Sequence, residues 1–477
     1  MKKLIYLALP MLFFTTACKK DLTSLNIETK KPAAVPAGPL FASATRQFAD
    51  NMASASVNTN IWRFAVKHWA MTTYNDEVQF DYSTRNIPQT WWTVLYRDVL
   101  LDYKSAAKTI SESTTLLAGV KANQLAMVDI MQLYVYSVMV NTFGNIPYTQ
   151  ALDPEKNLLP VYDDAKTVYY DLMKRLDADI AALNTGSAGF AAGEDFLYKG
   201  NVSSWIKFAN SIRFKMGMLL ADSDAGAAKT AVEASDAKAF TSAADNAQFA
   251  YLTGTPNTNP LYVDIVLGGR GDYVGAKDLI DPMKALNDPR VPLYFNKNNA
   301  GNYAGGTSGT TNTLSQFSQP SAKVTDANTP QVFLDYSEME FLRAEAKERG
   351  FNVAGTAETH YNNAVTASIV WWGGTAGDAA TYLAQPAVAY ATAAGSYKQK
   401  IGTQKWIALY NRSFDGWLEY RRLDFPVLTL PVGAKSGYPN RFPYPNNEQQ
   451  LNGDNYKAAA TAMGGDKVEY KLFWDKN

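Results

Sequence analysis

The sequence predicts a mainly α-helical protein: a tetratricopeptide-like scaffold of helix pairs with a loop-rich insertion and a few short strands. Three observations predict this class. Apolar residues recur at intervals of three and four through most of the chain after residue 40. Residues 336–371 form a helix-turn-helix of about the 34-residue tetratricopeptide length. Residues 252–330 are instead rich in Gly, Asn, Thr and Pro, and their apolar runs are short.

Length and composition exclude several classes of protein. The 477 residues are 47% hydrophobic, enough to bury one large core or two ordinary ones, which excludes a disordered or fibrous chain. Lys plus Arg and Asp plus Glu both number 45, so the chain lacks the basic excess that phosphate binding requires. We therefore expect no nucleic-acid partner.

The first 17 residues are expected to be a lipoprotein signal peptide. Lys2 and Lys3 precede an apolar run at 4–14, and a Thr-Thr-Ala segment then leads to Cys18, the only cysteine of the chain. The apolar run would cover about 17 Å as a helix, too short for a bilayer core of about 30 Å. The segment before Cys18 resembles a bacterial lipobox, although Thr15 stands where Leu is usual. We predict lipid attachment at Cys18; the alternative is an ordinary secretory signal with an incidental thiol.

Residues 18–39 are predicted to be the acylated cysteine and a flexible tether, because they are rich in Lys and Pro and lack hydrophobic periodicity. Residues 40–477 are predicted to form a single helical domain, with a loop-rich insertion at about 252–330 and a loop-rich C-terminal wrap at 425–477.

Helices in the first half of the domain are predicted from apolar spacing. The helix at 91–116 carries a clear repeat of three and four, whereas the helix at 125–143 is apolar almost all round. A helix of that kind is buried or spans a membrane, and Asp129 and Gln132 favour burial. Ser203 is a candidate N-cap for the last of these helices. The expected ranges are 41–56, 91–116, 125–143, 162–183 and 202–220.

After the insertion, helices are expected at 336–349, 357–371, 376–384 and 397–422. The stretch 401–424 holds the densest aromatic and charged residues of the chain, with a second helix expected to start after Ser413. Its aromatics could stack on nucleic acid, or they could form a buried face whose arginines pair with nearby acids. Glu419, Arg421, Arg422 and Asp424 lie within about one helical turn, which favours the buried interpretation.

Motifs for catalysis or metal binding are scarce. Only His68 and His360 are available as imidazole ligands or bases, and no zinc spacing, nucleophile elbow or phosphate loop occurs. Both histidines are predicted to be structural. We expect no catalytic residues, no metal and no cofactor, although a pair of carboxylates for glycoside hydrolysis depends on a spatial separation that a sequence does not show.

Aromatic residues are the most abundant candidate ligand contacts. A sugar ring can lie flat on an indole or phenol while polar neighbours bind its hydroxyl groups, and peptide ligands can use similar platforms; core packing claims most of these rings. Rings in loop-like segments are therefore the best candidates. The predicted ligand-binding residues are Tyr74, Tyr82, Trp91, Tyr262, Tyr273 and Trp372.

Six motifs in order resemble the SusD/RagB family of nutrient-binding outer-membrane lipoproteins, more narrowly its SusD-like branch. They lie at 141–151 (NTFGNIPYTQA), 205–213 (WIKFANSIR), 288–295 (DPRVPLYF), 336–350 (YSEMEFLRAEAKERG), 401–422 and 441–448 (RFPYPNNE). The resemblance implies a tetratricopeptide-like scaffold, a surface-exposed lipid anchor in the outer membrane, and a lid over a SusC-like TonB-dependent transporter. It implies ligand capture rather than catalysis, and it assigns no individual binding residue.

These observations predict a cell-surface binding protein that captures an oligosaccharide and passes it to a SusC-like transporter. Three alternatives stay open: a binder of peptides or other nutrients, a lipid-anchored glycoside hydrolase, and a structural subunit that gates its partner.

Overall fold

The computed structural model describes residues 35–82 and 84–476. The chain divides after residue 36 into two units, and the described helices and strands all lie in the second, residues 37–477. The predicted signal peptide, Cys18 and most of the predicted tether lie outside the described residues. Helix α2 begins at Ala37, four residues before the helix expected at 41–56.

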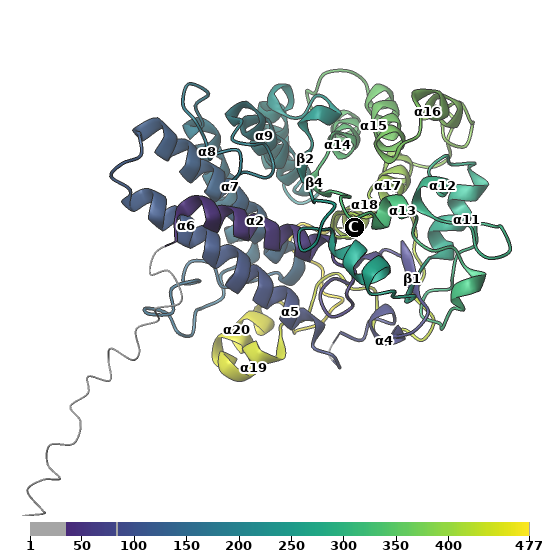
Figure 1. Cartoon of the computed structure of the whole chain (residues 1–477), viewed down its shortest axis with the longest axis horizontal. Helices are drawn as coiled ribbons and strands as arrows, with labels where there is room; N and C mark the ends of the chain where they lie inside the picture. Colours follow the sequence, from purple (N-terminus) through teal and green to yellow (C-terminus); the bar gives the residue numbers. More distant parts are fainter. Residues whose placement is uncertain (1–34, 83, 477) are drawn as a thin grey trace, which may run out of the picture. The chain divides into compact units, whose positions relative to one another are not determined.

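Helices dominate the second unit (Figure 1). Those of its first half are α2 (Ala37–Ala53), α3 (Trp62–Ala65), α4 (Asn75–Val78), α5 (Ile87–Thr93), η2 (Val94–Leu100), α6 (Leu101–Glu112), α7 (Ala118–Phe143), α8 (Ala165–Ala182), α9 (Val202–Leu219), α10 (Ala225–Ser235), η3 (Asp236–Lys238) and η4 (Ala243–Asp245). Those of its second half are η5 (Tyr262–Leu267), α11 (Lys277–Ala285), α12 (Val291–Tyr294), η6 (Leu314–Gln316), α13 (Ala322–Thr325), α14 (Tyr336–Glu348), α15 (Ala357–Trp372), α16 (Ala376–Leu383), α17 (Tyr397–Ala408), α18 (Ser413–Leu423), α19 (Asn446–Leu451) and α20 (Gly453–Ala462).

Helices that follow one another in the chain pack as pairs. Contacts join α7 to α8, α9 to α10, α14 to α15 and α17 to α18, and further contacts of α8 with α9 and of α14 with α9 and α17 link the pairs. Each pair buries an apolar face that it could not bury alone. The predicted tetratricopeptide-like scaffold is confirmed.

Two short antiparallel pairings complete the described secondary structure. Strand β1 (Trp69–Met71) pairs with β3 (Tyr273–Gly275), and β2 (Ala247–Phe249) pairs with β4 (Gln331–Leu334). Strand β3 lies in the predicted insertion and its partner lies about 200 residues earlier in the chain. The insertion also contains more helix than its composition suggested, namely η5, α11, α12 and α13.

Other differences from the sequence-based expectations are local. The N-cap of α9 is Asn201 rather than Ser203, and its Oδ1 accepts a hydrogen bond from Ser204 N–H at 3.1 Å. Within 397–422 the expected second helix is confirmed: α17 ends at Ala408 and α18 begins at Ser413, with Asn411 between them in a left-handed backbone conformation at φ 67°.

Helix α7 is the central core helix. It is long and apolar enough to cross a membrane by composition, but 83% of its most apolar window is buried by the surrounding protein. Asp129, one of its two charged residues, pairs with Arg175 of α8. These contacts confirm that α7 is a core helix.

The stretch 401–424 lies in the core. Trp417 is fully buried, with its ring 4.0 Å from that of Trp62, and its Nε1 donates to the Pro439 carbonyl at 2.7 Å. The expectation of local ion pairs holds for Arg422, which binds Glu419 at 2.6 Å. It is wrong for Arg421. Its guanidinium stacks on the Trp417 ring at 3.4 Å and donates hydrogen bonds to the carbonyls of Asn440 and Asn141, which the local spacing of charges does not show.

Buried ion pairs join the helix pairs to one another. Lys215 of α9 lies 2.9 Å from Glu338 of α14 and also pairs with Asp415 of α18. Arg412, just before α18, pairs with both acids and with Asp335. Burial raises the pKa of the Glu338 carboxyl, but the two cations outweigh it and hold that pKa below its usual value.

A second buried cluster lies along the same helices. Arg422 binds Glu345 of α14 at 2.5 Å, and Lys405 of α17 binds Glu419 at 2.8 Å. Burial opposes ionisation of Glu345, yet Arg422 and Arg349 lower the pKa of its carboxyl to about 2. Both clusters therefore stay charged at neutral pH and link α9, α14, α17 and α18.

We expect Glu338→Ala to lower the free energy of unfolding by about 3–5 kcal/mol, because Lys215 and Arg412 stay buried and lose one of the carboxylates that compensate their charge. Urea unfolding at neutral pH measures the loss. The control is Glu112→Ala, whose partner Lys108 is 73% exposed, and that change should cost no more than about 0.5 kcal/mol. Equal losses for the two variants would show that the buried pairs do not hold the helices together.

Candidate functional site

Most of the predicted ligand-binding rings are enclosed by protein. Tyr82, Trp91, Tyr273 and Trp372 are at most 3% exposed. Trp91 meets Trp62 edge-on at 5.6 Å, Tyr82 meets Phe442 at 5.3 Å, Tyr273 packs on Trp69 and Trp372 packs on Tyr294. Since their partners come from distant parts of the chain, the sequence could not show this enclosure. These four rings present no open face for stacking.

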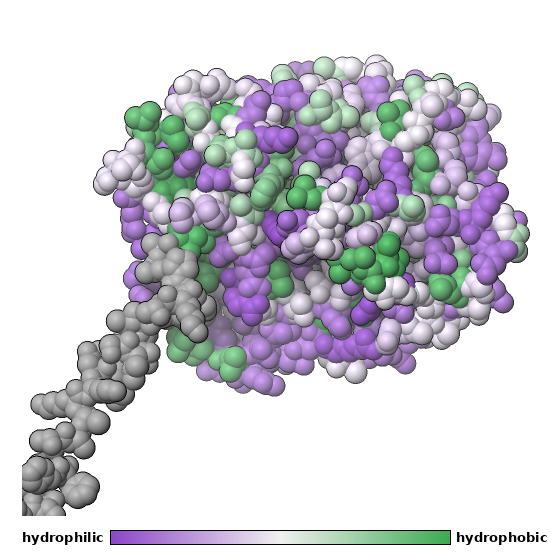
Figure 2. Space-filling model, in the orientation of Figure 1, coloured by the Kyte–Doolittle hydropathy of each residue, from purple (hydrophilic) through white to green (hydrophobic). Residues whose placement is uncertain are grey.

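Tyr262 is half-buried at the start of η5. The outer side of η5 carries Val263, Val266 and Leu267, each 43–54% exposed. Figure 2 shows this apolar patch in the region where the teal η5 segment lies in Figure 1. Tyr262 therefore stays a predicted ligand contact beside an apolar patch.

Tyr74 differs from the other five because its side chain is 50% exposed. It lies between β1 and α4, with φ 55° and ψ 57°, a left-handed conformation that is uncommon for a bulky residue. Neighbouring bonds hold this strained turn: Thr72 N–H donates to the Asp272 carbonyl at 2.9 Å, and the Thr72 hydroxyl donates to the Gly271 carbonyl. Such strain persists only where the surroundings impose it, and it concentrates at functional sites.

A cation covers the Tyr74 ring. The guanidinium carbon of Arg85 lies 5.4 Å from the ring centroid, within the range of a cation–π contact. Arg85 is fixed by Glu77 at 2.7 Å and lies 4.0 Å from Asp76. Burial raises the pKa of the Glu77 carboxyl, and the nearby Arg85 opposes this rise. The ring and the guanidinium therefore hold one another in place.

Polar groups from the insertion border Tyr74. The amide of Asn75 lies 3.2 Å from the Thr311 hydroxyl. The buried Asn312 donates to the Met71 carbonyl at 2.7 Å and to the Thr310 carbonyl at 2.9 Å, which fixes this turn against the end of β1. We call Tyr74, Asn75, Asp76, Arg85 and Thr311 the Tyr74 surface.

The Tyr74 surface combines an aromatic ring with a guanidinium, a carboxylate, an amide and a hydroxyl at the solvent boundary. The ring can contact the C–H face of a sugar, while the polar groups donate to and accept from its hydroxyls. Sequence reasoning predicted Tyr74 as a ligand contact but named none of the polar groups around it. Thr311 lies 236 residues from Asn75, and no local pattern links the two.

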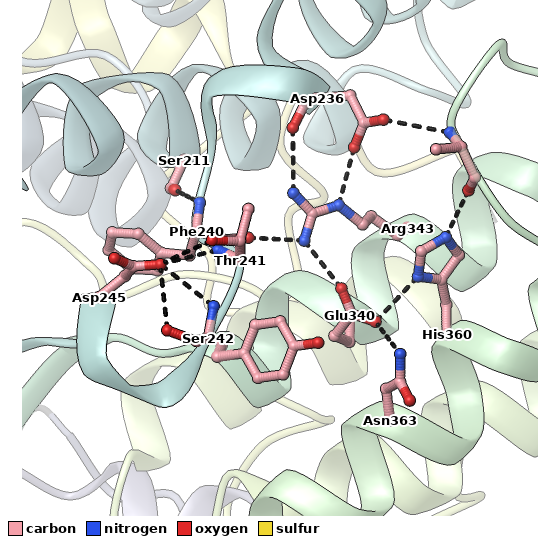
Figure 3. Close-up of polar contacts among 12 residues, drawn as sticks. Ser211, Asp236, Phe240, Thr241, Ser242, Asp245, Glu340, Arg343, His360 and Asn363 are labelled. Carbon is pink, nitrogen blue, oxygen red and sulfur yellow. Dashed lines mark hydrogen bonds and ion pairs between the residues drawn. The ribbon is translucent and has the colours of Figure 1, made fainter.

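The two histidines serve structure. His68 is fully buried, its Nε2 lies 3.0 Å from the Trp406 carbonyl, and burial lowers its pKa to about 3. Figure 3 shows His360 between two acceptors: Nδ1 lies 2.9 Å from Glu340 Oε2 and Nε2 lies 2.6 Å from the Ala354 carbonyl. Among residues 35–82 and 84–476, no group of His, Cys, Asp and Glu is arranged to hold a metal ion.

The His360 cluster predicts a pH-dependent contribution to stability. Burial alone lowers the pKa of His360, but its bonds to Glu340 and Ala354 outweigh burial and raise it above the usual value of about 6.5. The unfolded chain keeps the usual value, so the stabilisation is complete below about pH 6.5 and is lost as the pH rises through the raised pKa. We expect the stability difference between the wild type and His360→Gln to shrink between about pH 5.5 and pH 8.5 in urea unfolding.

Glu340→Gln is the matched control, because it keeps the shape of the acceptor and removes its charge. In that background His360→Gln should show a much weaker pH dependence. A difference that grows with pH in the wild-type background would contradict the assignment of a charged His360.

Comparisons with known proteins place the fold. The model of the SusD-like_2 family, described as starch-binding and associating with the outer membrane, matches residues 29–445. A solved chitin-binding protein is 25% identical with a TM-score of 0.79, covering 93% of this chain and 100% of its own. A SusD homolog from Bacteroides uniformis is 25% identical with a TM-score of 0.76, covering 92% and 99%. No match was found among curated proteins.

A chitin-binding SusD homolog from Flavobacterium johnsoniae is 23% identical with a TM-score of 0.78, covering 92% of this chain and 99% of its own, and supports the fold alone. All three structures extend over nearly the whole described chain. The resemblance seen in the six sequence motifs is thus confirmed.

Proposed function

The chain belongs to the SusD-like family of starch-binding proteins that associate with the outer membrane, and we propose that it captures an oligosaccharide at the Tyr74 surface. The captured ligand would pass to a SusC-like TonB-dependent transporter in the same membrane. The family description supports the carbohydrate class. The sequence resemblance supports the transporter as partner.

One observation carries the choice of surface: Tyr74 is held half-exposed in a strained backbone conformation with the Arg85 guanidinium over its ring. Core packing does not require an exposed ring in a left-handed turn. A ring already fixed by Arg85, β3 and the Asn312 turn loses little freedom when a sugar stacks on it. Pre-organisation of this kind favours binding.

The same groups favour binding over hydrolysis. Glycoside hydrolysis usually uses two carboxyl groups that flank the scissile bond. Glu77 is fully buried and paired with Arg85, which leaves Asp76, 55% exposed, as the accessible carboxylate of the Tyr74 surface. The surface therefore fits recognition without bond cleavage.

We expect Tyr74→Ala to weaken oligosaccharide binding by at least about tenfold, because the stacking face is lost. Calorimetric titration with malto- and chito-oligosaccharides, alongside a peptide panel, measures the change. Tyr74→Phe keeps the ring and should retain most of the affinity. Phe196→Ala removes a ring that is 38% exposed elsewhere and should leave binding unchanged.

If Tyr74→Ala binds the oligosaccharide with full affinity, Tyr74 is not part of the binding site. Binding of peptides alone by the wild type would exclude the carbohydrate class and favour a peptide-binding member of the family.

The proposed location is the outer membrane, with a lipid anchor on Cys18 and the folded domain facing outward. Metabolic labelling with radioactive palmitate tests the anchor: the wild type should incorporate label and fractionate with outer membranes, and Cys18→Ser should do neither. Several acyl chains on one residue anchor firmly, at about 0.8 kcal/mol per buried CH2. Label in Cys18→Ser would contradict the assignment.

A further inference from the structure

A cleft of about 360 Å³ lies where the C-terminal end of α15 meets the segment that leads into β4. Its walls include Gln248, Lys323, Asp326, Asn328, Trp371 and Trp372. The volume falls within the range of about 300–1,000 Å³ that is usual for small-ligand sites. None of these residues belongs to the Tyr74 surface.

Two indole rings form the apolar part of this Trp371 cleft. The rings of Trp371 and Trp372 are nearly perpendicular, at 80°, with centroids 4.8 Å apart. Trp372 is fixed from behind by Tyr294 at 4.8 Å and by Tyr410 at 5.7 Å. Trp371 is only partly buried, so its ring is accessible in the cleft, and the packed neighbour Trp372 holds its backbone in place.

The polar side chains of the cleft have unused hydrogen-bonding capacity. Those of Gln248, Lys323, Asp326 and Asn328 make no hydrogen bond or ion pair with another residue that the structure describes. Gly373 leaves room for the Lys323 ammonium, since a Cβ at Gly373 would lie 2.9 Å from Lys323 Nζ. Donors and acceptors thus converge beside the indoles without satisfying one another.

The backbone of the cleft is fixed by side chains from outside it. Asn259 Nδ2 donates to the Thr329 carbonyl at 2.7 Å, and Asn259 N–H donates to the Ala327 carbonyl at 2.7 Å. The Thr329 hydroxyl donates to the Lys323 carbonyl, also at 2.7 Å. The segment 323–329 is therefore held in shape before any ligand arrives.

We propose that the Trp371 cleft is a second carbohydrate-binding site, which takes a neutral sugar unit. Lys323 and Asp326 have opposite charges, so the cleft has no net preference for a charged ligand. Indole faces fit the C–H surface of a pyranose, and the amide, ammonium and carboxylate groups fit its hydroxyls. The ligand class rests on the proposed function, whereas the location rests on the cleft itself.

Two separate sites would let one long polysaccharide bind twice. The second contact is then intramolecular, so retention of a long chain exceeds that of a short oligosaccharide without new contacts.

Calorimetric titration of the full chain in detergent with maltotriose and chitotriose tests the proposal. We expect two sites in the wild type. In Trp371→Ala one of them should bind at least about tenfold more weakly, while the other keeps its affinity. Tyr74→Ala should weaken the other site in the same way, and the double variant should weaken both. Asn328→Ala, a change of an exposed side chain that leaves the core intact, should weaken the same site as Trp371→Ala. Trp371→Phe is the ring-retaining control.

The outcomes separate the two proposals. Wild-type binding in both Trp371→Ala and Asn328→Ala would overturn the cleft as a site and leave the Tyr74 surface standing. If binding is lost in Trp371→Ala and Asn328→Ala but is unchanged in Tyr74→Ala, the cleft is supported as a site and Tyr74 is excluded as a ligand contact. Both proposals would be overturned if the wild type bound neither maltotriose nor chitotriose, or if it bound only peptides.

Discussion

The buried ion pairs around Glu338 are the constraint on which the rest of this structure depends. Lys215 and Arg412 bring α9 and α18 onto α14, and Arg412 also donates to the Phe333 carbonyl of β4 at 2.9 Å. Removal of one partner would leave an uncompensated buried charge, so these pairs favour the arrangement in which α9, α14 and α18 meet. Strand β4 is thereby fixed, together with the segment before it that shapes the Trp371 cleft.

The scaffold holds loops, and the loops carry the candidate chemistry. Tyr74 keeps a strained backbone because β3, Asn312 and Arg85 hold its neighbours. Trp371 keeps its position because Trp372, one residue later, is packed into the core. In both places a rigid element positions a ring while irregular backbone supplies polar groups, as is usual for binding sites on a stable framework.

Burial separates structural aromatics from candidate ligand contacts. Trp62, Trp91 and Trp417 pack on one another or on neighbouring rings and hold the helices together. Tyr74 and Trp371 instead combine partial exposure with polar neighbours. Trp371 was not among the rings chosen from the sequence, although the adjacent Trp372 was; in this structure Trp372 is buried and Trp371 is partly exposed.

The sequence by itself determined the helical class, the order of the principal helices and the family. Apolar spacing is a local property: it follows from the turn of the helix, so α7, α9 and α14 could be recognised from their own residues. The family motifs, such as 141–151 and 441–448, are likewise contiguous stretches of chain. The expectation that the aromatics of 401–424 form a buried face is confirmed by Trp406 and Trp417, which are at most 2% exposed.

Only the tertiary structure decided which rings face solvent and which groups surround them. Thr311 meets Asn75 across 236 residues, and β1 pairs with β3 across about 200 residues; no local spacing encodes these contacts. Arg421 was expected to bind a neighbouring acid, but it stacks on Trp417 and binds carbonyls from two distant segments. Exposure and pairing depend on what the rest of the chain brings to a residue, which is why the site required the fold.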